Sequence, residues 1–109
     1  MKPTLKMFDL TGRRALVTGS SQGIGFAIAR GLAGAGAHVI VNGRDGAKTA
    51  AAAATLKAEG LSVEPQAFDV TDKAAVSAAI AAIEAGGPID VLVNNAGIQH
   101  RAPLVDFTE

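Results

Sequence analysis

The sequence contains no cysteine, no tryptophan and no tyrosine among its 109 residues. Without cysteine there is neither a disulfide framework nor a thiolate metal site. Ten basic residues balance ten acidic ones, so the charge favours neither a nucleic-acid partner nor an anionic membrane surface. The N-terminal segment lacks the apolar core of a signal peptide, and no apolar run approaches the length of a membrane span. These totals predict a cytoplasmic protein of one domain at most, with a limited core.

The most informative stretch is a glycine-rich turn, TGSSQGIG, at residues 18–25. It follows an apolar run and precedes a segment with apolar residues at helical spacing, which predicts a turn between a strand and a helix. Unpaired N–H groups at a helix N-terminus attract phosphate, and glycine lets an anion approach the backbone. We assign Gly19 to unusual dihedrals, Gly23 to the approach of a pyrophosphate and Gly25 to tight packing of the helix on the strand. A purely structural turn is the alternative.

Further apolar runs alternate with helical segments along the chain. The patterns predict strands over residues 13–18, 37–42, 61–68 and 89–94, and helices over residues 24–35, 46–59 and 72–85. In the first helix Ile24, Ile28 and Leu32 are expected to form the apolar stripe. Strands that alternate with helices in this way favour a parallel α/β sheet.

Two motifs carry a resemblance to a known family. The turn has the spacing G-x-x-x-G-x-G, and Asn94-Asn95-Ala96-Gly97 follows the last apolar run. Both resemble the short-chain dehydrogenase/reductase family, whose cofactor turn is TGxxxGIG and whose later motif is NNAG. The resemblance implies a partial Rossmann-type α/β fold with strand order 3-2-1-4 and helices on both faces. Residues 1–109 would then be the N-terminal part of a single NAD(P)-binding domain.

The residues after the second predicted strand indicate the preferred dinucleotide. In dinucleotide-binding folds an acidic residue there binds the adenosine ribose, whereas an arginine pairs with a 2′-phosphate. Gly43 stands in the place of the acid and Arg44 follows it, which favours NADP over NAD. The family's other frequent NADP marker, a basic residue within the glycine turn, is missing near Ser21, and Asp45 offsets Arg44 in part. A solvated turn residue is the alternative for Arg44.

The resemblance assigns further residues to the cofactor. In the family an aspartate at the position of Asp69 binds the adenine amino group and the next residue, Val70, lies against the ring; the alternative is that Asp69 or Thr71 caps the next helix. The NNAG backbone borders the cofactor ribose, and Asn95 steadies neighbouring strands or satisfies backbone groups. The predicted cofactor-binding set is Gly19, Ser21, Gln22, Gly23, Ile24, Gly25, Arg44, Asp69, Val70, Asn95, Ala96 and Gly97.

The segment after NNAG, at residues 98–107, bears on the substrate. It reads IQHRAPLVDF and resembles members of the family that act on a sugar acid. Arg101 is the candidate to hold the substrate carboxylate by paired hydrogen bonds, and His100 the candidate to assist at a hydroxyl. Exposed loop residues are the alternative for both. Another reductase of the family, such as one acting on 3-oxoacyl carrier protein, is the second candidate.

The residues that perform the family's chemistry are not in this chain. That chemistry uses a Tyr-x-x-x-Lys pair with an upstream serine, and the sequence has no tyrosine. We therefore assign no catalytic residue and no metal ligand, and expect the chain alone to be inactive. Two interpretations remain: the cofactor-binding part of an oxidoreductase, which the resemblance predicts to be a homotetramer when complete, or a nucleotide-binding fragment without catalysis.

Overall fold

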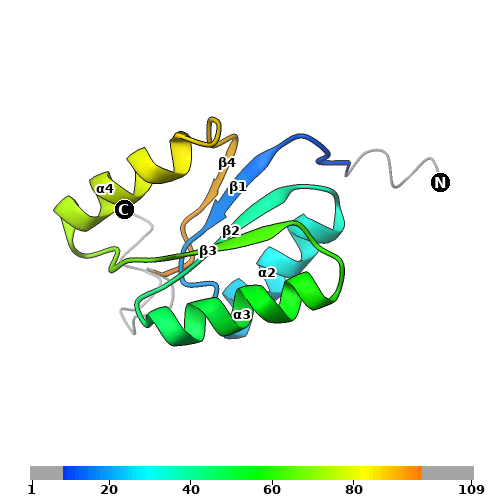
Figure 1. The fold of residues 1–109 in the computed structure, drawn as a ribbon, viewed down its shortest axis with the longest axis horizontal. Helices are drawn as coiled ribbons and strands as arrows, with labels where there is room; N and C mark the ends of the chain where they lie inside the picture. The colour runs from blue at the N-terminus through cyan, green and yellow to red at the C-terminus, as the bar shows by residue number, and fades with distance from the viewer. Residues whose placement is uncertain (1–8, 97–109) are drawn as a thin grey trace, which may run out of the picture.

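The structure, a computed structural model, describes residues 9–96 (Figure 1). Strands and helices alternate along the chain: β1 (Arg14–Val17), α2 (Gly23–Gly34), β2 (His38–Gly43), α3 (Gly46–Ala58), β3 (Val63–Ala67), α4 (Lys73–Glu84) and β4 (Val91–Val93). The strands pair in parallel in the order β3-β2-β1-β4. The predicted α/β fold and strand order are confirmed, and each predicted element is found with slightly different ends.

β1 lies inside the sheet, between β2 and β4. Leu16 is opposite Ile40 on one side and Leu92 on the other. The apolar run of β1 is continuous because both of its faces are covered. β3 lies at the edge, where Pro65 is paired with Val41; an edge strand accommodates a residue without a backbone N–H.

Helices cover both faces of the sheet (Figure 1). α2 and α3 cover one face, where Val17 and Val41 pack into a cluster with alanines of both helices. α4 covers the other face, where Leu16, Ile40 and Ile83 are buried together. Alternate residues of one strand therefore enter different clusters, as the period of a β-strand requires.

The buried face of α2 consists of small residues. Gly25, Ala29 and Ala33 are buried, whereas Ile24 is 68% exposed. The predicted stripe is therefore wrong at its first residue, and its other two members, Ile28 and Leu32, pack only at the margin of the cluster. Small side chains let the helix approach the sheet closely, which displaces the larger residues to its flanks.

Two kinds of feature are absent from residues 9–96. None of the helices there is both long enough and apolar enough to cross a membrane. Nor does this part of the chain gather three or more His, Cys, Asp or Glu side chains in a group that could hold a metal ion.

Candidate functional site

The glycine-rich turn leaves β1 and enters α2 through left-handed backbone. Gly19 has φ +61° and Gly23 has φ +63°, values that favour glycine. A Cβ on Gly19 would lie 3.0 Å from the Ala96 Cα, whereas one on Gly23 would meet no atom of residues 9–96 within 4 Å. Gly19 thus packs against the NNAG segment, and the space beside Gly23 is open to a ligand.

Gly25 is buried in the first turn of α2. A Cβ there would overlap the Gly19 carbonyl oxygen and lie 2.6 Å from Asn95 Nδ2. The role predicted for Gly25 was close packing on the strand. The packing is indeed close, but its partners are the turn itself and the asparagine that follows β4.

The N-terminus of α2 has no side-chain cap from residues 9–96. Gln22 occupies the N-cap position with extended backbone and forms no cap hydrogen bond, and the first turn contains no acidic residue. By contrast, Asp45 accepts a hydrogen bond from Lys48 N at α3, and Asp72 accepts one from Ala75 N at α4. Because the first N–H groups of a helix find no acceptor within it, the start of α2 is suited to bind an anion.

Asn42, buried at the end of β2, holds the turn in place. Its Oδ1 accepts from Gly19 N at 2.9 Å, and its Nδ2 donates to the carbonyl oxygens of Gln66 and Phe68 at 3.1 and 3.2 Å. Ser20 is also buried: its Oγ donates to Val17 O at 2.7 Å and accepts from Asn42 N at 2.9 Å. Sequence reasoning missed both residues, although a polar residue ending an apolar strand signals a hydrogen-bonded role.

Thr18 joins the glycine-rich turn to the NNAG segment. Its hydroxyl donates to Asn94 Oδ1 at 3.1 Å and accepts from Ala96 N at 3.1 Å. The buried Asn95 donates through Nδ2 to Gly19 O at 3.0 Å. The two motifs therefore meet in space, and Asn95 satisfies a backbone carbonyl of the turn.

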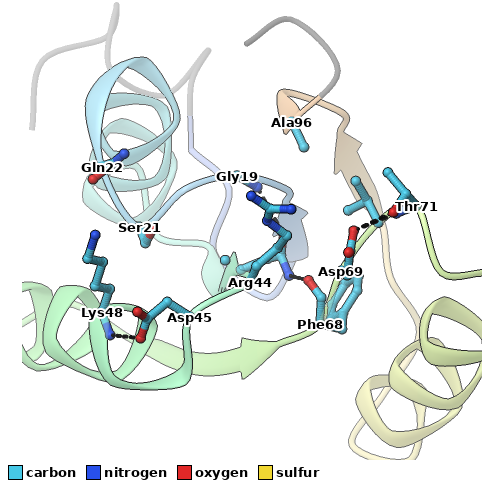
Figure 2. Close-up of a pocket in the computed structure, with 13 residues that line it drawn as sticks. Gly19, Ser21, Gln22, Arg44, Asp45, Lys48, Phe68, Asp69, Thr71 and Ala96 are labelled. Carbon is cyan, nitrogen blue, oxygen red and sulfur yellow. Dashed lines mark hydrogen bonds between the residues drawn. The ribbon is translucent and has the colours of Figure 1, made fainter. Parts of the chain in front are cut away.

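The turn borders a groove of about 400 Å³ (Figure 2). Gly19, Ser21 and Gln22 line it on the turn's side, and Asp69 and Val70 line it beyond the end of β3. Arg44 and Ala96 also line it. The structure therefore brings seven of the predicted cofactor-binding residues to one groove.

The other predicted residues lie elsewhere. Gly25 and Asn95 are buried behind the turn, and Gly23 and Ile24 begin α2 without lining the groove. Gly97, His100 and Arg101 lie outside the described residues. Sequence reasoning did not assign Lys48 or Phe68 to the site, and both line the groove.

The end of β2 leaves no space for an acidic residue. A Cβ on Gly43 would lie 2.6 Å from Thr49 Oγ1 and 2.9 Å from Ser21 Oγ. Thr49 is fully buried and its hydroxyl donates to Asp45 O at 2.7 Å, so it cannot move aside cheaply. The packing around Gly43 therefore excludes an aspartate or glutamate at this position.

Arg44 is exposed at the same end of the groove. The ion pairs within residues 9–96 are Arg30–Glu59 and His38–Glu64, so Arg44 belongs to neither. Asp45, expected to offset Arg44, instead uses its carboxylate to cap α3. The guanidinium points into the groove (Figure 2) and has no paired carboxylate within residues 9–96.

Asp69 forms a local turn on the opposite side. It accepts through Oδ1 from Thr71 N at 2.9 Å and from the Thr71 hydroxyl at 2.8 Å. These bonds, with a smaller contribution from the charge of Arg44, hold the pKa of Asp69 below its ordinary value. The alternative that Asp69 or Thr71 caps the next helix is wrong, because Asp72 caps α4.

Comparisons with known proteins agree with this geometry. The family model described as short chain dehydrogenase matches residues 13–109. The gluconate 5-dehydrogenase of Gluconobacter oxydans is 53% identical over 103 residues, which cover 94% of this chain and 40% of that protein.

Several solved structures are similar as well, and two of them illustrate the match. One is a gluconate 5-dehydrogenase from Burkholderia cenocepacia in complex with NADP and tartrate, with TM-score 0.81, 51% identity and coverage of 94% of this chain and 40% of that one. The other is a 3-oxoacyl (acyl-carrier-protein) reductase from Agrobacterium tumefaciens with NADP bound, with TM-score 0.75, 47% identity and coverage of 84% and 35%. This chain spans at most 40% of these relatives. It belongs to the short-chain dehydrogenase family.

Proposed function

We propose that this chain is the NADP-binding part of an oxidoreductase that interconverts D-gluconate and 5-dehydro-D-gluconate. The observation that carries the proposal concerns the part of the chain that the structure describes: there, the N-terminus of α2 has no side-chain cap, and the groove beside it is lined by Arg44, which forms no ion pair. Relatives of more than 50% identity are named gluconate 5-dehydrogenase, and one of them was solved with NADP. Residues 1–109 would form the N-terminal part of a single Rossmann domain.

The described residues fit a dinucleotide with a 2′-phosphate. The open side of Gly23 and the first N–H groups of α2 would take the diphosphate. Arg44 would pair with the 2′-phosphate, and the closed space at Gly43 disfavours the ribose contact of an NAD site. Asp69 and Val70 would hold the adenine. The remaining proposed contacts are Gly19, Ser21, Gln22, Ile24, Gly25, Asn95, Ala96 and Gly97.

The cofactor would supply a hydride from its nicotinamide ring, or accept one. Arg101 would hold the sugar-acid carboxylate by paired hydrogen bonds and His100 would assist at a hydroxyl. The residues that move the proton lie outside this chain, which has no tyrosine. For the complete enzyme we propose a cytoplasmic homotetramer, on the family resemblance.

Calorimetric titration of Arg44→Ala with NADP and with NAD tests the cofactor assignment. Loss of a charge-assisted contact should weaken NADP about tenfold or more and leave NAD nearly unchanged. Arg13→Ala is the matched control, because Arg13 is exposed and does not line the groove. Equal loss for both nucleotides would rule out a 2′-phosphate contact.

A kinetic assay tests the proposal that this chain binds the cofactor but does not contain the residues that transfer the proton. The 109-residue chain, mixed with gluconate and NADP, should give no change in nicotinamide absorbance. Measurable turnover would contradict the assignment of proton transfer to residues outside it. A nucleotide-binding fragment without catalysis gives the same result alone but no activity in the complete protein.

The second candidate is a 3-oxoacyl carrier-protein reductase, which the Agrobacterium tumefaciens structure favours. The two candidates share the cofactor half and differ in the substrate. Assays of the complete enzyme with 5-dehydro-D-gluconate and with a 3-oxoacyl thioester separate them. Faster reduction of the thioester would replace the first candidate with the second.

A further inference from the structure

Lys48, in the first turn of α3, is a basic residue without a role among the cofactor contacts proposed above. Lys48 lines the groove together with Arg44, Ser21 and Gln22. Its side chain extends from α3 along the side of the groove where Gln22 lies (Figure 2). Lys48 is exposed, and it takes part in neither of the ion pairs formed within residues 9–96.

The backbone beneath this side chain is held in one position. Lys48 N donates to Asp45 Oδ1 at 3.1 Å, and the next residue, the buried Thr49, donates to Asp45 O. The Asp45 carboxylate is thus engaged by the helix cap rather than by the Lys48 ammonium. Because the turn is fixed, the Cα–Cβ bond of Lys48 has a fixed direction and the side chain starts from a defined point.

The charges of the side chains that line the groove favour a second basic contact to the 2′-phosphate, in addition to Arg44. Among the described residues, Arg44 and Lys48 are the groove's basic lining residues, and Asp45 and Asp69 are its acidic ones. A phosphate monoester carries about −1.5 to −2 charges at neutral pH. One guanidinium neutralises only part of that charge, and two nearby carboxylates oppose binding. The glycine turn supplies no base of its own, since Ser21 and Gln22 occupy that part of the groove.

We propose that Lys48 is a second binding residue for the 2′-phosphate and therefore a determinant of the choice of NADP over NAD. The inference rests on the proposed function. Lys48 provides from α3 the charge that the glycine turn lacks. An ammonium on a flexible four-carbon stem acts as a mobile point charge, so it reaches the phosphate without the planar geometry that Arg44 needs.

The test is calorimetric titration of the 109-residue chain with NADP, NAD, 2′,5′-ADP and 5′-AMP. Lys48→Met keeps the length of the side chain and removes its charge. We expect about threefold to tenfold weaker binding of NADP and 2′,5′-ADP, unchanged binding of NAD and 5′-AMP, and a shallower dependence of NADP binding on salt. Lys57→Met, in the last turn of the same helix and away from the groove, should match the wild type.

Lys48→Arg keeps the charge and should retain NADP binding within about twofold, while circular dichroism verifies the fold of every variant. Equal NADP affinity for Lys48→Met and Lys57→Met would overturn the role of Lys48, and so would equal weakening of NADP and NAD. In either case Arg44→Ala would still test the proposed function separately. A folded wild-type chain that binds neither NADP nor 2′,5′-ADP would overturn the proposed function, and this inference with it.

Discussion

α2 begins differently from α3 and α4, although each helix follows a strand of the same parallel sheet. In α3 and α4 an aspartate at the N-cap position accepts a hydrogen bond from the first turn, whereas Gln22 has a similar extended backbone and no such bond. A cap is worth about 1 kcal/mol. The difference shows that α2 gives up this stabilisation at the helix end that faces the groove, where a bound anion would take the place of the cap.

Instead of a side-chain cap, buried contacts between the turn and the NNAG segment stabilise the start of α2. Gly25 packs against Gly19 O and Asn95, and Asn95 in turn donates to Gly19 O. These contacts involve a buried glycine and a buried asparagine, and they use none of the first N–H groups of α2. The shape of the turn is therefore independent of any side-chain cap.

Gly25→Ala should have the largest effect, because it breaks the packing that replaces the cap. The new methyl group would overlap the Gly19 carbonyl oxygen, so we expect a loss of roughly 1–3 kcal/mol in the free energy of unfolding and loss of NADP binding. Urea unfolding and calorimetry measure both. Gly31→Ala is the control: no described residue would lie within 4 Å of the new Cβ, and the substitution should stabilise α2 by about 0.5–1 kcal/mol. Equal behaviour of the two variants would disprove the packing role.

Gln22→Asp tests the comparison directly by giving α2 the cap of its neighbours. The extended backbone of Gln22 is suited to an N-cap aspartate. We expect the free energy of unfolding to be unchanged or raised by about 0.5–1 kcal/mol, while NADP and NAD affinities fall together by about tenfold or more, because the carboxylate competes with the diphosphate. Unchanged affinity for both would show that the start of α2 binds no anion.

Asp72→Ala makes the opposite change, by giving α4 the uncapped start of α2. The bond from Ala75 N is lost, so the free energy of unfolding should fall by about 1 kcal/mol. NADP binding should not change, because Asp72 does not line the groove. Asp72→Asn preserves the acceptor and should be nearly neutral. A drop in NADP affinity without a drop in stability would contradict a purely structural cap.

The smallest effect is expected from Asp69, whose carboxylate is bonded before α4 rather than at its cap. Its folded pKa lies below the ordinary value of 3.8 because of the two bonds from Thr71. The stabilisation is therefore complete above that value and is lost as the pH falls through the lowered folded pKa. With Asp69→Asn, the free energy of unfolding, measured by urea unfolding at a series of pH values, should fall less steeply at low pH than in the wild type. Thr71→Val, which keeps only the backbone donor, should give an intermediate profile; a profile like the wild type's would argue against the hydroxyl bond.

The sequence predicted the strands and helices from their periodicity, and the order of the strands from the family resemblance. It could not predict the small buried face of α2, since close approach to the sheet depends on residues far away in the chain. The hydrogen-bond partner of Asn42 and the role of Thr49 could not be predicted for the same reason, because each depends on contacts with the turn or with the end of β2. Among Asp69, Thr71 and Asp72, only the geometry shows which one caps α4.

The hydroxyl of Thr18 has a consequence for synthesis on the ribosome. It bonds Asn94, which lies 76 residues later in the chain, so this contact cannot form while the chain is still short. Until β4 has emerged and paired, a nascent polypeptide can form the Asn42 contacts of the glycine motif but not those of Asn94 and Asn95. The ability to bind a nucleotide should therefore arise late and abruptly during translation, together with the completed sheet.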